Sequence, residues 1–97
     1  MEPPRRWLIA YDIAEDPRRA RIAHLLGAHG DRVQYSVFVV DLRPARLVRL
    51  RTELTQIMDV TDSILVVDLG PVGSLAPGRF SYIGRQRPIT PSGPLVL

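Results

Sequence analysis

Apolar residues recur along the chain with two different periods, which predict strands alternating with helices. Residues 7–11 form a short apolar run of strand-favouring types that ends at Asp12. Residues 33–42 are rich in β-branched and aromatic types, alternating at first and then continuously apolar. They predict a long strand that is bent and countable as two. Residues 63–68 predict a further strand.

Two stretches carry the helical period instead. Asp16 and Pro17 supply an N-cap and a first-turn proline, and apolar residues then follow at helical spacing, which predicts a helix over residues 17–29. Pro44 opens a second stretch in which leucine and isoleucine recur every three or four residues as far as Asp59. This predicts the second helix.

Beyond residue 69 the pattern becomes less regular. Glycine, proline and serine dominate residues 70–78, which predicts a loop, and residues 80–83 are typical of a short strand. The proline-rich residues 85–97 end in an apolar segment suited to joining a sheet edge. We therefore expect one domain over residues 1–84 and a C-terminal arm over residues 85–97.

The order of elements predicts an α+β fold in which both helices pack on one face of a sheet. The runs 7–11, 37–40 and 64–67 are apolar on both alternating faces, although two helices can cover only one of them. Most homo-oligomers are dimers with one self-complementary patch. We therefore expect a homodimer that buries the uncovered face.

Composition narrows the class of protein. A chain of 97 residues with 45% hydrophobic and 24% charged residues is typical of one folded domain and excludes general disorder. Absence of cysteine excludes disulfides and thiolate zinc sites. The residues before Asp12 include too few apolar ones for a signal peptide or a membrane span, so we expect a cytoplasmic protein without membrane attachment.

The basic residues are all of one type. The 13 cationic residues are arginines, and the formal net charge is +3. A guanidinium stays charged at physiological pH, and its planar fork matches two phosphate oxygens. A polyanionic partner is therefore plausible, although charge alone does not decide it.

Asp12 is the first candidate for chemistry. A carboxylate directly after a strand is either a turn cap or a site residue, and its neighbours favour a site. Arg18, Arg19 and Arg21 lie near the start of the predicted helix, where the macrodipole disfavours cations. Together with free N–H groups they form a phosphate-binding arrangement. The alternative is that they are solvated or paired with Glu15 and Asp16.

Other residues extend this candidate site. Arg32 continues the basic edge, and Ser36 and Phe38 share one face of their strand, although Phe38 alone would be a core residue. Asp12 has no nearby carboxylate partner in its own strand. Two copies of Asp12 across a dimer axis would suffice for one Mg²⁺, which keeps several water ligands.

The second helix carries its own basic residues. They form a solvated face or a nucleic-acid contact, and the sequence leaves both open. They are Arg43, Arg46, Arg49 and Arg51.

These motifs at this spacing resemble one known family. The matching segments are Tyr11-Asp12-Ile13, Arg18-Arg19-Ala20-Arg21-Ile22 and Gly30-Asp31-Arg32-Val33-Gln34-Tyr35-Ser36-Val37-Phe38. They resemble the small CRISPR-associated Cas-two family, the partner of the spacer integrase, over residues 7–69.

The resemblance implies a ferredoxin-like fold, a homodimer with facing sheets, and one Mg²⁺ shared by the Asp12 residues of both chains. It implies Tyr11, Asp12, Ser36 and Phe38 as catalytic residues, with Arg19, Arg21 and Arg32 on nucleic acid, to which the local pattern adds Arg18. Residues 85–97 would dock on the second chain or on the integrase.

Two functions follow from the resemblance. The first is CRISPR adaptation, in which the dimer bridges the integrase and holds duplex DNA, with an accompanying Mg²⁺-dependent phosphodiesterase activity on RNA or DNA. Single-stranded RNA is a second candidate partner of this dimer. The alternative is a stand-alone, toxin-like metal-dependent ribonuclease. One aspartate per chain is a small catalytic inventory, which favours the DNA-bridging function.

Overall fold

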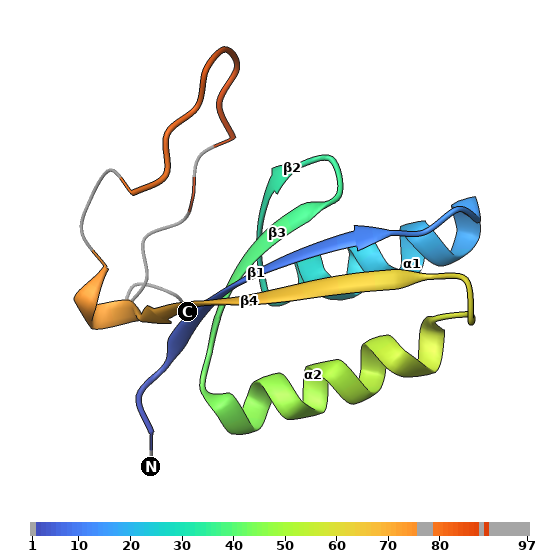
Figure 1. Ribbon diagram of the computed structural model, residues 1–97, viewed down its shortest axis with the longest axis horizontal. Coiled ribbons are helices and arrows are strands. Elements are labelled where there is room, and N and C mark those ends of the chain that lie inside the picture. Colours follow the sequence, from blue (N-terminus) through green and yellow to red (C-terminus); the bar gives the residue numbers. More distant parts are fainter. Residues whose placement is uncertain (1, 76–78, 88, 90–97) are drawn as a thin grey trace.

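The protein, described here from a computed structural model, alternates strands and helices as the sequence pattern predicts (Figure 1). The structure describes residues 2–75, 79–87 and 89. The elements are β1 (Arg5–Asp12), α1 (Asp16–Gly27), β2 (Gly30–Gln34), β3 (Val37–Leu42), α2 (Pro44–Ile57) and β4 (Ser63–Pro71), followed by a 3₁₀ turn (Val72–Ser74).

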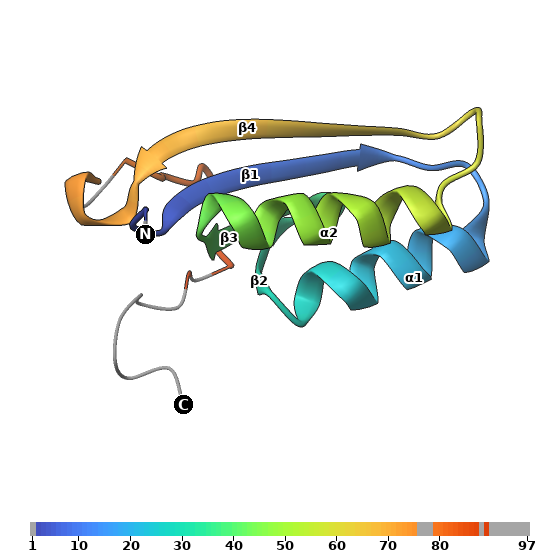
Figure 2. The same ribbon diagram turned by 90° about the horizontal axis from the view of Figure 1, so that it is seen from below.

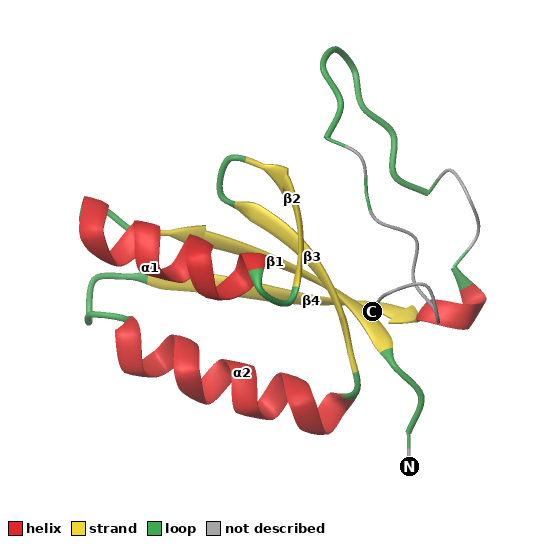
Figure 3. Cartoon of the chain, turned by 180° about the vertical axis from the view of Figure 1, so that it is seen from behind, coloured by secondary structure: helices red, strands yellow, loops and turns green. Residues whose placement is uncertain are grey.

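The sheet has four strands in the order β2-β3-β1-β4, and every neighbouring pair is antiparallel. Both helices cover the same face of this sheet (Figures 2 and 3). This is the ferredoxin-like α+β fold, which confirms the predicted class. No helix in the described part of the chain is long and apolar enough to cross a membrane.

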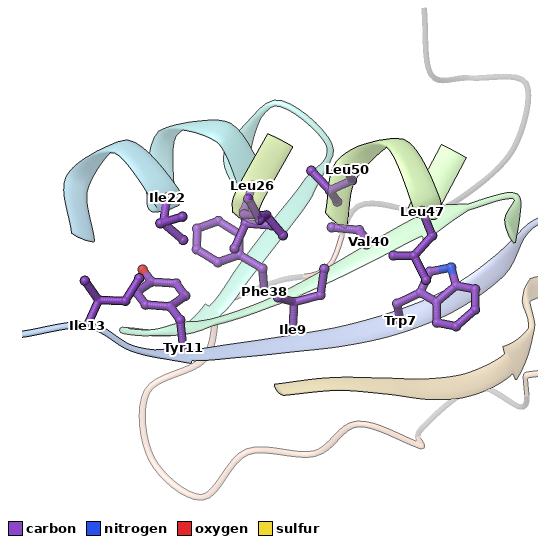
Figure 4. Packing of buried hydrophobic residues seen from close by; sticks show 11 residues of the cluster. Trp7, Ile9, Tyr11, Ile13, Ile22, Leu26, Phe38, Val40, Leu47 and Leu50 are labelled. Carbon is purple, nitrogen blue, oxygen red and sulfur yellow. The ribbon is translucent and has the colours of Figure 1, made fainter. Parts of the chain in front are cut away.

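The core lies between the sheet and the two helices. Alternate residues of β1 point toward the helices, as Figure 4 shows for Trp7, Ile9 and Tyr11. Ile22, Leu26, Leu47, Leu50 and Leu54 pack against them from the two helices. Burying a large apolar side chain stabilises a fold by roughly 1.5–3 kcal/mol, so this layer fixes how β1 is oriented.

The opposite face of the sheet is also apolar in its middle. Residues paired across strands share a face, so Leu8 lies beside Val67 and Ala10 lies between Val37 and Leu65. Leu65 is 58% exposed, and neither helix covers these residues. We call this surface, formed by Leu8, Ala10, Val37, Leu65 and Val67, the open face.

The predicted bent strand is two strands, β2 and β3, joined by a turn at Tyr35 and Ser36. Gly30 is the first residue of β2, where the backbone of β2 approaches that of β3 closely. A Cβ placed on Gly30 would lie 2.1 Å from the carbonyl oxygen of Val39, so only glycine fits. Gly30 therefore allows the close pairing of β2 with β3.

Helix boundaries differ slightly from the prediction. α1 ends at Gly27 rather than His29, because the His29 N–H donates to the carbonyl of Leu26 and tightens the last turn before β2. The second helix ends at Ile57 rather than Asp59.

The strand predicted at residues 80–83 is wrong, since the structure shows no strand there. The loop prediction for residues 70–78 is wrong at its start, where Gly70 and Pro71 extend β4. Most of the predicted arm, residues 88 and 90–97, lies outside the described residues.

Candidate functional site

Asp12 is the last residue of β1, and its side chain is exposed. Tyr11 and Ile13 are buried toward the helices, so alternation places Asp12 on the same side as the open face. It pairs in register with Ser63 at the start of β4. The sequence prediction that Asp12 stands at a strand end is therefore confirmed.

One chain does not provide a full set of metal ligands. Among the residues that the structure describes, no group of three or more His, Cys, Asp or Glu side chains could hold a metal ion. Mg²⁺ is bound through one or two carboxylates and keeps several waters, so an exposed carboxylate such as Asp12 has the right donor type. A second carboxylate would have to come from another chain.

Tyr11, Ser36 and Phe38 are brought together where the β2–β3 turn meets the end of β1. The Tyr11 N–H donates to the carbonyl of Ser36 at 3.0 Å, and the Tyr11 and Phe38 rings lie 6.3 Å apart. Both rings are buried on the helix side of the sheet, opposite to Asp12. Their geometry suits the support of this corner, and a catalytic role for them stays a prediction.

Arg32 packs into the same corner from β2. Its guanidinium lies 5.2 Å from the Phe38 ring centre and 5.5 Å from that of Tyr35, and it donates to the Tyr11 hydroxyl at 3.2 Å. Its Nε is buried and makes no hydrogen bond with the described residues. Cation–π contacts therefore hold this arginine, rather than an acidic partner.

Arg18 binds carboxylates instead of lying open to solvent. It donates to both Asp62 oxygens at 2.8 and 3.2 Å and contacts Glu15 at 3.1 Å. The Arg18 guanidinium, helped by the Asp59 N–H, holds the pKa of Asp62 below its ordinary value. This pair joins α1 to the loop that precedes β4.

Arg19 closes the loop between β1 and α1. It donates to the carbonyl oxygens of Ile13 at 2.7 Å and Ala14 at 3.3 Å, and it pairs with Asp16. Desolvation lowers the pKa of Arg19, but hydrogen bonds with Asp16 and Tyr35 outweigh that effect and leave the pKa raised. The paired alternative from the sequence thus describes Arg18 and Arg19.

Arg21 differs from its two neighbours. It is exposed, and its guanidinium makes no hydrogen bond or ion pair within the described part of the chain. The same holds for the guanidinium groups of the four arginines expected on or beside the second helix, which are Arg43, Arg46, Arg49 and Arg51. Of the four arginines predicted to contact nucleic acid, Arg21 is therefore the most available to an external phosphate.

Sequence reasoning did not single out Tyr35, which is 65% exposed at the turn between β2 and β3. Its carbonyl oxygen accepts a hydrogen bond from the Tyr11 hydroxyl at 3.3 Å. The sequence did place an aromatic residue between Arg32 and Ser36. Because residues 33–42 were interpreted as one bent strand, the turn at this residue was not predicted.

The family described as "CRISPR associated protein Cas2" matches residues 5–72. The chain belongs to the Cas2 family. It is 37% identical over 81 residues to "CRISPR-associated endonuclease Cas2 2" of Thermus thermophilus, covering 73% of this chain and 90% of that protein. It is 38% identical over 66 residues to "CRISPR-associated endoribonuclease Cas2 4" of Rhodospirillum rubrum, covering 67% of this chain but 53% of that one.

Solved structures agree with this membership. "Hypothetical protein TT1823" from Thermus thermophilus superposes with a TM-score of 0.74 at 30% identity, covering 90% of this chain and 99% of the other. A chain of the "Partial Cas6-RT-Cas1--Cas2 complex" superposes with a TM-score of 0.64 at 25% identity, covering 95% and 99%. In this chain, residues 5–72, which match the family, form the four-stranded sheet and the two helices.

Proposed function

We propose that this Cas2 chain acts in CRISPR adaptation as a homodimer that binds duplex DNA and joins it to the spacer integrase. The observation that carries the proposal is Asp12 standing on the same side of the sheet as an uncovered apolar face. The family membership supplies the setting. A related chain is found in a structure described as a Cas1–Cas2 complex, which supports the integrase as partner.

Duplex binding would rest on phosphate contacts. Arg21 is exposed, while Arg18 and Arg19 already bind Asp62 and Asp16. Contacts to phosphates position a protein on DNA without reading its sequence, and their strength falls steeply with salt. A dimer would present such arginines twice, which suits a protein that grips a duplex at two places.

Asp12 of both chains would hold one Mg²⁺, which when bound lowers the pKa of a water molecule and polarises a phosphodiester. The chain's own part is to present each carboxylate on an exposed strand end held by the buried Tyr11 and Ile13. The names of the relatives, endonuclease and endoribonuclease, support testing this activity on RNA and DNA. A stand-alone toxin-like ribonuclease is the alternative for the same residues.

The deciding experiment compares Asp12→Asn with wild type in two assays, nucleic-acid cleavage with Mg²⁺ and spacer acquisition with the integrase. We expect the cleavage rate to fall by at least about 100-fold, because the variant loses the carboxylate that would hold the Mg²⁺. Spacer acquisition should persist. Glu53→Gln, at an exposed carboxylate on α2, serves as the matched control and should leave both assays unchanged.

Loss of acquisition as well as cleavage, in a variant that remains a folded dimer, would defeat the scaffold function. RNA cleavage by wild type that needs no integrase, together with no acquisition, would favour the toxin-like alternative.

A further inference from the structure

Tyr35 occupies an unusual place for an aromatic residue. It lies in the turn between β2 and β3 and is 65% exposed, whereas Tyr11 and Phe38 beside it are buried. Exposing most of an aromatic ring forgoes the free energy that its burial would supply. The ring is therefore placed for contact with something outside the chain.

One arginine holds the Tyr35 side chain in position. The Arg32 guanidinium lies over the Tyr35 ring, 5.5 Å from its centre. Arg32 is in turn fixed by Phe38 and by the Tyr11 hydroxyl. The backbone at Tyr35 is fixed as well, because its carbonyl oxygen accepts the Tyr11 hydrogen bond. A ring supported in this way loses little freedom when a ligand stacks on it.

An exposed ring beside a guanidinium group has a specific chemical complement. Nucleobases stack on aromatic side chains, and arginine neighbours bind the attached phosphates. In a duplex both faces of a base are covered by its neighbours, whereas an unpaired base offers a free face. A protein partner would instead call for further apolar anchors around the ring, and Gln34 and Ser36 flank it with polar groups.

The Tyr35 turn lies at the same end of the sheet as Asp12. The Tyr11 N–H donates to the Ser36 carbonyl at 3.0 Å, and Asp12 is the next residue along β1. Arg32, which lies over the Tyr35 ring, also contacts Phe38 and the Tyr11 hydroxyl, whereas alternation along β1 places Asp12 on the opposite side from Tyr11.

We propose that Tyr35, supported by Arg32, is a stacking platform for an unpaired nucleotide, in RNA or in a frayed DNA end, next to the Asp12 strand end. This inference deepens the proposed nucleic-acid function and rests on it. The platform adds a preference for single-stranded segments to the sequence-independent phosphate contacts of the arginines.

The test measures binding of full-length protein to three probes of one mixed sequence: single-stranded RNA, single-stranded DNA and a blunt DNA duplex. Fluorescence anisotropy of labelled probes gives each dissociation constant at one fixed salt concentration. The variants are Tyr35→Phe, which keeps the ring, and Tyr35→Ser, which removes it. Val60→Ser, at a loop side chain that is 96% exposed, is the matched control.

We expect Tyr35→Ser to weaken single-strand binding about tenfold or more and duplex binding less than about twofold, since the lost base stack contributes only where an unpaired base is present. Tyr35→Phe and Val60→Ser should bind like wild type. If Tyr35→Ser does not fold by circular dichroism, Tyr35→Leu removes the π face while keeping apolar bulk.

An equal loss on all three probes would overturn the platform, because it indicates a phosphate or folding effect. Unchanged binding of Tyr35→Ser to the single strands would overturn it too. So would a wild-type protein that does not bind single-stranded probes. Failure of the proposed function is distinguishable, because it would show as absent binding of wild type to the duplex.

Discussion

Individual arginines of one chemical type take different roles according to their partners. Arg18 forms a bidentate pair with Asp62, whereas Arg32 lies over two aromatic rings and makes no ion pair with the residues that the structure describes. Arg21, three positions along α1 from Arg18, remains exposed. Local sequence placed all of them near one phosphate-binding surface, and the structure divides them into supports and available contacts.

The Arg18–Asp62 pair makes an acid-dependent contribution to stability. The pKa of Asp62 is lowered by Arg18, so folding favours its charged form. That contribution is fully present above the unfolded pKa of about 4 and is lost as pH falls through the lower folded pKa. Below about pH 4, we expect the unfolding free energy of Asp62→Asn to decrease less with falling pH than that of wild type, as measured by urea titrations at several pH values.

Arg18→Gln provides the matched variant for this pair. Because it removes the partner rather than the titrating group, it should flatten the same part of the pH profile. A wild-type slope retained in both variants would mean that other carboxylates carry the acid dependence.

The candidate residues could be predicted unequally from the sequence. Asp12 at the end of a strand followed from local pattern, because a strand end is set by nearby residues. The burial of Phe38 and the exposure of Tyr35 depend on where the chain reverses between β2 and β3. That reversal is fixed by pairing with β1, a tertiary effect that a continuous apolar run does not reveal.

Among the elements, β2 and β3 depend on close contact between their backbones. Gly30 pairs with Val40, and a register shift between Arg32 and Gln34 lets the ribbon bend into the Tyr35 turn. Residues 80–83 behave differently. They are of strand-forming types, yet Ile83 is fully exposed and the structure shows no strand there. A segment of strand-forming residues becomes a strand only when a neighbouring strand pairs with it.

Gly30→Ala should destabilise the fold. The new Cβ would lie 2.1 Å from a backbone oxygen and 2.9 Å from the Val40 Cα, neither of which can rotate away. We expect a loss of about 1–3 kcal/mol or more in unfolding free energy, measured by urea denaturation. Gly73→Ala, with nothing within 4 Å of its Cβ, should stay within about 0.5 kcal/mol of wild type.

Equal effects of the two alanines would contradict this account. They would indicate that general glycine flexibility, rather than the close approach of β2 to β3, governs the result.

For the whole molecule, the two faces of one sheet have separate tasks. The helices cover Trp7, Ile9 and Tyr11, while the open face is bounded by the Arg6–Asp41 pair near the start of β1 and by Asp12 at its end. A second copy stacked on the open face would bury its apolar middle. The helix count and the apolar runs sufficed to predict, from the sequence, that one face of the sheet lies uncovered; the dimer stays a prediction.

Leu65→Glu should break the proposed dimer. Its side chain is 58% exposed on the open face, and stacking a second copy there would bury an unpaired carboxylate. We expect the variant to be a monomer at micromolar concentration by light scattering, with a dimer dissociation constant raised at least about tenfold. Val48→Glu, 63% exposed on α2, should leave the wild-type assembly intact.

A monomeric wild type, or a dimer insensitive to Leu65→Glu, would contradict stacking through this face. Assembly lost in Val48→Glu but kept in Leu65→Glu would point to the helix side instead.

The order β2-β3-β1-β4 also determines when the fold can form. β1 is an inner strand, yet its two partners lie far along the chain, at Val37–Leu42 and Ser63–Pro71. Only the β2–β3 ribbon and the helices rely on nearby residues, so they can form early, while β1 must wait. During synthesis, β1 therefore stays unpaired along one edge until residue 71 has been added. That interval is when this chain is most exposed to aggregation.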